Sequence, residues 1–195
     1  MSAFASTIDA WKREKGPLRI LSASGQLGYG IPEPAFRAGL ARKPHLIGAD
    51  MGSVDPGPYY LGAGKLATAR RSSKRDLGLA IVGAVRNRIP FILGTAGTGG
   101  GDPHLAETME IIREIAREND LNFRVATIGA EMPRDVVKAA VRAKKVTAIG
   151  PIEALTEAEV DGAARIVGQM GMEAFQRAID LEPDIIIAGR ACDTA

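Results

Sequence analysis

The sequence predicts an α/β protein whose doubly wound, mostly parallel sheet carries helices on both faces. Short apolar, β-branched runs alternate with amphipathic stretches along the chain. Each run is apolar along its whole length, which is typical of strands buried on both faces of a parallel sheet. Six such alternations, joined by right-handed crossovers, give a doubly wound sheet rather than a barrel of eight units.

Six segments fit this description of a buried strand, and turn or helix signals separate them. Helices are expected in the intervals. The predicted strands are Arg19–Ser22, Leu46–Ala49, Phe91–Leu93, Phe123–Ile128, Val146–Ile149 and Asp184–Ala188.

Several helix starts are marked by capping patterns. Residues 102–103, Asp-Pro, place an N-cap before a proline at the first helical position. Ser73–Asp76 and Thr156–Glu159 resemble capping boxes, and Pro133 opens a further helix. Apolar stripes should turn these helices toward the core. The stripes are Leu105, Met109, Ile112, Ile115 and Ala116, then Val136, Val137, Ala140 and Val141, and finally Met172, Phe175 and Ile179.

The sequence suggests two parts: residues 1–17 form a polar helical lead-in, and residues 18–195 form the α/β domain. The last strand, Asp184–Ala188, is followed by a polar loop with no helix to cover it. An uncovered strand of a parallel sheet exposes apolar surface. We therefore expect the domain to be truncated at its C-terminus.

Composition excludes several classes of protein. With 46% hydrophobic residues and a net charge of +2, the chain is neither intrinsically disordered nor basic enough to indicate nucleic-acid binding. A single cysteine excludes an internal disulfide framework. No membrane-spanning run and no signal peptide are visible, so a cytoplasmic location is expected. The basic cluster Arg70–Arg75 contains no aromatic residue, which favours a solvated connection, with a clamp for a small anion as the alternative.

The predicted site lies at the carboxyl edge of the sheet, where open parallel sheets bind ligands. The loops expected at that edge are long and rich in glycine and polar residues, whereas those at the opposite edge are short. The loops at the carboxyl edge are Ser22–Gly30, Asp50–Gly62, Gly94–His104, Gly129–Glu131 and Gly189–Asp193.

The glycine-rich loop before His104 is the strongest candidate for holding an anion. Backbone N–H groups at Gly97, Thr98, Gly99 and Gly100 can approach a ligand closely, beside a helix N-terminus. His104 is a candidate general acid or hydrogen-bond donor, with an exposed first-turn residue as the alternative. The alternative interpretation of this segment is a flexible loop that binds no ligand. The chain contains no Walker A loop and no G-x-G-x-x-G motif, so neither ATP nor NAD is expected.

Two aspartates frame the loop after the second strand. Asp50 and Asp55 can act as a general base or as ligands of a divalent cation, with Ser53 between them to bind substrate. The alternative is a structural loop, in which Asp50 caps backbone N–H groups and Asp55 forms an Asx turn. The residues therefore do not decide the identity of the cofactor: either a divalent cation or a CoA-ester substrate fits them.

Other strand ends supply further candidates. Glu131 is a candidate base, or else it stabilises the N-terminus of the next helix. Arg190 and Asp193 are candidates for binding a carboxylate and a hydroxyl or amine. Cys192 is expected to fill space, and His45 lies at the opposite edge, where a structural role is expected.

Three stretches resemble one known family. They are residues 47–60 (Ile-Gly-Ala-Asp-Met-Gly-Ser-Val-Asp-Pro-Gly-Pro-Tyr-Tyr), 94–97 (Gly-Thr-Ala-Gly) and 187–193 (Ile-Ala-Gly-Arg-Ala-Cys-Asp). They resemble the N-terminal domain of the acyclic terpene utilisation protein A (AtuA) family, from about Leu18 onward. The resemblance implies a role in the breakdown of acyclic terpenes such as citronellol and geraniol, or of branched acids. Family members are considerably longer, which implies an incomplete domain here, and the resemblance transfers no catalytic residue.

The leading hypothesis is a catabolic lyase or hydratase acting on a small carboxylate or an acyl-CoA. In it, the glycine loop and His104 stabilise an enolate oxygen, Asp50 or Asp55 moves a proton and Arg190 orients a carboxylate. One alternative is a non-catalytic binding subunit that docks through its last strand and the apolar helix 77–85. Another is a hydrolase using metal-bound water on Asp50, Asp55 and Asp102. A homo-oligomer or a chain with a partner subunit is expected.

Overall fold

The sheet has five strands, all parallel, and the predicted fold class is confirmed. The computed structural model describes residues 2–193. Its strands lie in the order β1-β2-β3-β5-β4, and their registers bring the carboxyl ends to one edge. The strands are β1 (Ile20–Ser22), β2 (Leu46–Asp50), β3 (Phe91–Gly94), β4 (Val125–Ile128) and β5 (Ile185–Ala188).

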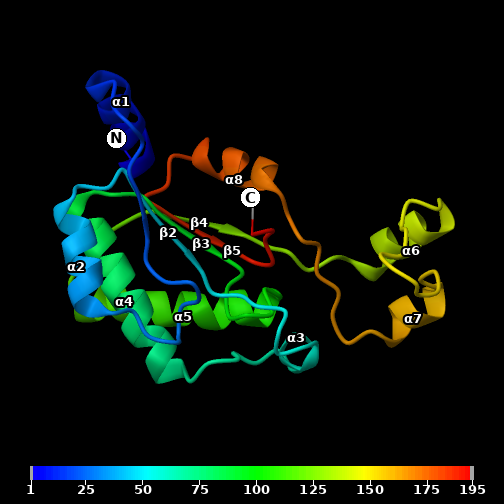
Figure 1. Ribbon diagram of the computed structural model, residues 1–195. Coiled ribbons are helices and arrows are strands. Elements are labelled where there is room, and N and C mark those ends of the chain that lie inside the picture. The colour runs from blue at the N-terminus through cyan, green and yellow to red at the C-terminus, as the bar shows by residue number, and fades with distance from the viewer. Residues whose placement is uncertain (1, 194–195) are drawn as a thin grey trace.

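Helices cover both faces of this sheet. In Figure 1, α2, α4 and α5 lie below it, whereas α1 and α8 lie above it. The helices are α1 (Ala3–Glu14), α2 (Glu33–Ala41), α3 (Tyr59–Ala63), α4 (Arg70–Asn87), α5 (Asp102–Glu118), α6 (Arg134–Arg142), α7 (Glu157–Gly162) and α8 (Met172–Ile179).

The main core lies between the sheet and the layer of α2, α4 and α5. Alternate strand residues such as Ile47, Phe91 and Ile187 point into it and meet Ile81 and Ile112 of the helices. Burying one such side chain contributes about 1.5–3 kcal/mol. The core therefore holds the strand ends rigidly, which is the condition for a precise site at the carboxyl edge.

A smaller core lies on the other face, beneath α8. Phe175 of α8 packs with Ile186 and Ala188 of β5 and with Phe4 of α1. This cover does not reach the far edge of the sheet, where Ile20 of β1 is 59% exposed.

The last strand is not uncovered, and that prediction is wrong. β5 lies between β3 and β4, and all of Ile185–Ala188 is buried. The chain passes from β3 to β4 and then returns to insert β5 between them. The strand order depends on contacts between residues far apart in the sequence, so no local sequence pattern indicates it.

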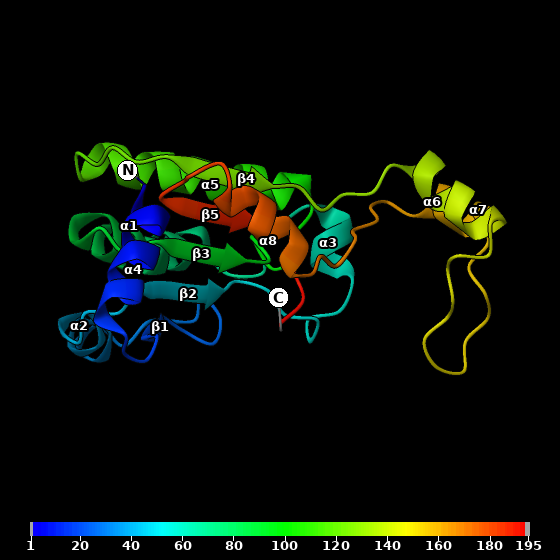
Figure 2. The ribbon, with the colours of Figure 1, turned by 90° about the horizontal axis from the view of Figure 1, so that it is seen from above.

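The predicted strand Val146–Ile149 is also absent. These residues lie in the connection between α6 and α7, which together project away from the sheet as an arm (Figures 1 and 2). Ile149 is 94% exposed, because no neighbouring strand is there to pair with this apolar run.

Two of the four predicted helix starts differ from the structure. Pro133 directly precedes α6, as predicted. The Thr156–Glu159 capping box is confirmed. Ser73–Asp76 lies inside α4 instead, where the Asp76 carboxylate accepts hydrogen bonds from the N–H groups of Gly28, Gly30 and Ile31. The cap of α5 is Gly101, so the Asp-Pro pair occupies the first helical positions. Within residues 2–193, no helix has both the length and the apolar character needed to cross a membrane.

Candidate functional site

The loops after β2, β3 and β5 converge at the carboxyl edge of the sheet. The Met51 N–H donates to Gly94 O at 3.0 Å, which ties the β2 loop to β3. The Arg190 N–H donates to Gly100 O at 3.1 Å, which ties the β5 loop to the glycine loop after β3. The three loops therefore form one surface, as the predicted site requires.

Asp50 is the last residue of β2 and lies partly buried at this junction. The nearby N–H groups of Gly52 and Met51 and the Thr95 hydroxyl favour its ionised form and lower its pKa. Burial nevertheless raises the pKa of Asp50, and the negative charge of Asp193 acts in the same direction. A carboxyl group of raised pKa can exchange protons nearer neutral pH than an exposed one.

Arg190 brings a positive charge to the same junction. Its Nη2 donates to Thr98 O at 2.6 Å and to Ser53 O at 3.4 Å. Burial lowers the pKa of Arg190, and the charges of Asp50 and Asp193 oppose that effect. The guanidinium stays charged, as arginine does in proteins, and it is held in place by the loops on either side.

Two cavities open at this edge. One, of about 540 Å³, includes Asp50, Asp193 and Cys192 and has an apolar floor of Ile20, Leu46 and Ile92. The other, of about 390 Å³, includes Arg190, Ser53, Thr98 and Gly99 among apolar neighbours. Small-molecule sites typically combine an apolar lining with a few polar groups in this way.

Backbone strain is concentrated in the loop after β3. Thr95 and Thr98 have φ values of 50° and 73°, in the left-handed region that β-branched residues rarely adopt. Such a residue costs about 1–3 kcal/mol and persists where its surroundings hold it. Both threonines are buried. Thr98 O accepts from the Arg190 side chain and Thr95 Oγ1 accepts from the Ala191 N–H, so the strained backbone lies at the same junction as the charged groups.

The glycines of this loop are required by close packing. A Cβ at Gly100 would lie 2.3 Å from the Arg190 nitrogen, and one at Gly97 would lie 2.8 Å from the His104 Cβ. The N–H groups of Thr98, Gly99 and Gly100 all donate to carbonyl groups within the loop. An anion would have to displace one of these bonds to reach them.

The His104 side chain lies beneath the loop rather than at its surface. It is fully buried, and its Nε2 donates to Tyr60 O at 2.9 Å, which ties α5 to α3. Burial lowers the pKa of His104, so the ring is neutral at pH 7. The structure thus does not place His104 beside Asp50 in an open cavity.

The remaining predicted residues lie at the margins of the junction. The Asp55 side chain is exposed, and its backbone N–H donates to Ser53 Oγ. Glu131 accepts from the Asp102 N–H and from Arg165, each at 3.1 Å, so it caps α5 and holds the base of the arm. Catalytic roles for Asp55, His104 and Glu131 stay predictions.

Comparison with models of protein families shows to which family the chain belongs. Residues 80–195 match the model described as acyclic terpene utilisation family protein AtuA. The chain belongs to the AtuA family. Comparison with curated proteins and with solved structures gives no significant match. The matched segment contains the glycine loop and Arg190, whereas Asp50 precedes it.

Sequence analysis of this AtuA chain missed Thr95. Its hydroxyl accepts the Ala191 N–H at 3.3 Å, and the residue lines the same cavity as Asp50. Its one available signal was its position directly after β3, at the start of the glycine loop. His45 at the opposite edge has the expected structural role, because its Nδ1 accepts from the Arg19 N–H.

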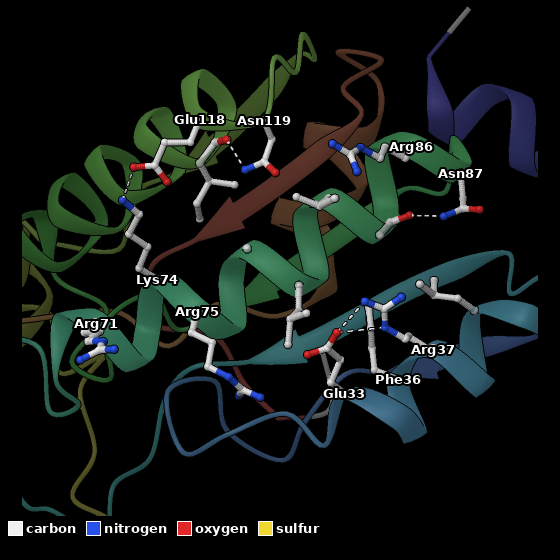
Figure 3. A pocket seen from close by; sticks show the side chains of 16 residues that line it. Glu33, Phe36, Arg37, Arg71, Lys74, Arg75, Arg86, Asn87, Glu118 and Asn119 are labelled. Carbon is white, nitrogen blue, oxygen red and sulfur yellow. Dashed lines mark hydrogen bonds and ion pairs between the residues drawn. The ribbon is translucent and has the colours of Figure 1, made fainter.

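A further cavity, of about 640 Å³, lies far from this junction, among α2, α4 and α5 (Figure 3). Part of the basic cluster lies at its rim, but Lys74 pairs with Glu118 and Arg75 with Asp76. Arg70 pairs with Glu107 and Glu114 of α5. The cluster therefore joins two helices. In the apolar segment 77–85, Leu77 and Ile81 are core residues, while Leu79, Val82 and Val85 are partly buried.

The described residues contain no group of three or more His, Cys, Asp or Glu side chains placed to hold a metal ion. Asp50, Asp55 and Asp102 do not form such a group.

Proposed function

We propose that this AtuA chain is a lyase or hydratase that acts on a small carboxylate or acyl-CoA during the utilisation of acyclic terpenes or branched acids. One observation carries the proposal: a partly buried carboxyl group of raised pKa, Asp50, interacts electrostatically with a charged Arg190 where three loops meet. Acid–base catalysis next to a fixed positive charge is the chemistry that these two groups suit.

In the hydration direction, Arg190 orients the carboxylate or thioester carbonyl of an α,β-unsaturated substrate. Asp50 accepts a proton from water as the oxygen bonds to the β-carbon and the carbon–carbon π electrons move toward the carbonyl. The proton that Asp50 accepted then passes to the α-carbon, so that one water is added in all and Asp50 returns to its ionised form. In the reverse direction, protonated Asp50 assists the departure of the hydroxyl group as water.

The test is turnover of a panel of α,β-unsaturated carboxylates and their CoA esters, followed by loss of the conjugated absorbance. Asp50→Asn keeps the shape of the side chain but removes the carboxyl group that accepts and donates a proton, and we expect the rate to fall by about 10²–10⁴-fold. Asp55→Asn is the matched control, because Asp55 is an exposed aspartate on the same loop, and its rate should stay within about twofold.

Full activity of D50N, or equal losses in D50N and D55N with both proteins folded, would contradict the proposal. A second candidate is a non-catalytic binding subunit, which the exposed apolar residues Ile20 and Ile149 favour. That candidate predicts no turnover of any compound in the panel and a mass in solution that rises only when a partner chain is added.

A further inference from the structure

We propose that the tip of the arm, residues 143–155, docks on a second copy of this chain and covers the cavity that includes Asp50 and Asp193. In a two-fold dimer, each arm covers the cavity of the other copy. The inference goes beyond the proposed function, since it assigns an interaction surface and not a reaction. It places the candidate site between two copies, because the tip then forms the outer wall of this cavity.

The tip of the arm carries a group of exposed aliphatic side chains. Ile149 is 94% exposed and Ile152 is 68% exposed, and Val146 and Leu155 are exposed on either side of them. Figures 1 and 2 show this segment projecting away from the sheet, beyond α6 and α7. Single apolar residues are common on protein surfaces, but a group of them on one projecting segment is typical of an interaction site.

The arm is built to present this tip at a distance from its own sheet. At the base of the arm, Glu131 and Val167 form an antiparallel bridge, which sets the direction in which the arm leaves the carboxyl edge. Farther out, Arg142 of α6 pairs with Glu157 of α7 at 2.6 Å. The two helices thus brace each other, and the tip between them is available to another chain.

The cavity of about 540 Å³ supplies a matching apolar surface. Its floor consists of Ile20, Leu46 and Ile92, which lie on three neighbouring strands. Ile20 on the edge strand β1 is 59% exposed. An apolar face of a sheet is normally covered by a second layer of structure. This part of the sheet therefore has room for an apolar segment from outside the chain.

The two surfaces carry opposite charges. Among the described residues, the charged ones that line this cavity are Asp50 and Asp193, whereas Arg190 lines the neighbouring cavity. The tip carries two exposed lysines, Lys144 and Lys145, against one carboxylate, Glu153. Complementary charges around an apolar contact favour one orientation of the partners. We therefore expect the lysines to lie on the aspartate side of the cavity.

Both halves of this contact belong to the same chain, which favours a second copy over an unrelated partner. The arm leaves the sheet at the carboxyl edge, and the cavity opens at that edge too (Figure 2). Two copies that face each other with their carboxyl edges can therefore exchange arms. A two-fold arrangement uses the same pair of surfaces twice and leaves neither an arm nor a cavity uncovered.

The experiment measures the mass in solution by light scattering over a range of protein concentrations. Ile149→Ser removes an apolar side chain from the tip, and because Ile149 is almost wholly exposed, the fold should not change. We expect the wild type to form dimers, with a dissociation constant at least about tenfold higher in I149S, because both contacts lose this side chain. Leu181→Ser is the matched control: Leu181 is a 72% exposed aliphatic residue between α8 and β5, at the opposite edge. The L181S dimer should be as tight as that of the wild type.

A charge reversal tests where the tip docks. The double variant K144E/K145E should weaken the dimer, and adding Asp193→Lys to the same chain should restore part of the affinity, since opposite charges face each other again. A wild type with the mass of one chain at every concentration would overturn the proposal, whether the tip then docks on its own chain or on a different protein. A dimer that I149S leaves unchanged, that L181S weakens equally, or that D193K fails to restore would also overturn it.

Discussion

Single residues at the junction are governed by opposing effects on their charge. At Asp50, burial disfavours the carboxylate, whereas the nearby N–H groups of Gly52 and Met51 and the Thr95 hydroxyl favour it. At His104, burial disfavours the imidazolium, and the bond to Tyr60 O favours it without overcoming burial. The pKa of Asp50 is thus raised, and the His104 ring is held neutral as part of the packing.

The buried His104 makes a specific prediction about stability and pH. Its folded-state pKa lies below the ordinary 6.5, so the unfolded chain takes up the proton first as the pH falls. The free energy of unfolding should therefore be fully maintained above pH 6.5 and should decrease as the pH falls below it. Urea unfolding at several pH values measures this decrease.

His104→Gln keeps a donor toward Tyr60 O and should flatten the dependence on pH. Asp50 has a raised pKa and contributes with the opposite sign, losing stability as the pH rises above 3.8, so both proteins are best compared in a D50N background. The same slope with and without His104 would show that its burial does not govern the acid response.

At the scale of elements, the site depends on how the β3 and β5 loops pack together. Gly100 is needed both for its φ of 67° and for the close approach of Arg190. Gly57 has a similar φ of 72° but nothing within 4 Å of where a Cβ would lie. Alanine substitutions at the two glycines therefore distinguish the cost of the left-handed backbone from the cost of moving the packed loop.

Gly57→Ala should lower the free energy of unfolding by about 1 kcal/mol, the cost of the left-handed backbone alone. Gly100→Ala should lower it by about 3 kcal/mol or more, because the Arg190 backbone must also move. Chemical denaturation of both variants measures the difference. Equal losses would mean that the β5 loop yields easily and does not hold Arg190 rigidly.

The sequence predicted which residues gather at the carboxyl edge of the sheet better than it predicted their hydrogen-bond partners. The carboxyl ends of parallel strands meet at one edge, so Asp50, Thr98 and Arg190 could be placed together from strand positions alone. The Thr95 hydroxyl was missed because its role depends on the Ala191 N–H, nearly 100 residues away (|i−j| = 96). Val146–Ile149 was wrongly assigned to a strand because a short apolar run does not reveal whether a neighbouring strand exists to pair with it.

For the whole molecule, the open question is which surface binds an anionic ligand. The carboxyl edge offers Arg190 beside Asp50, while the helical face offers the cavity lined by Arg71, Arg75 and Arg86 (Figure 3). The arm of α6 and α7 extends beyond the sheet from that same carboxyl edge (Figure 2). We propose that the carboxylate binds at the edge, because there a positive charge, a carboxyl group of raised pKa and a strained loop coincide.

The most direct test is calorimetric titration of small branched carboxylates into the wild type, Arg190→Gln and Arg86→Gln. We expect one carboxylate to bind per chain, with affinity at least about tenfold lower in R190Q, because a charged hydrogen bond is lost. R86Q, which removes a charge from the cavity on the helical face, should bind as the wild type does. Normal binding by folded R190Q, or a loss of binding in R86Q, would contradict the assignment of the site to the carboxyl edge of the sheet.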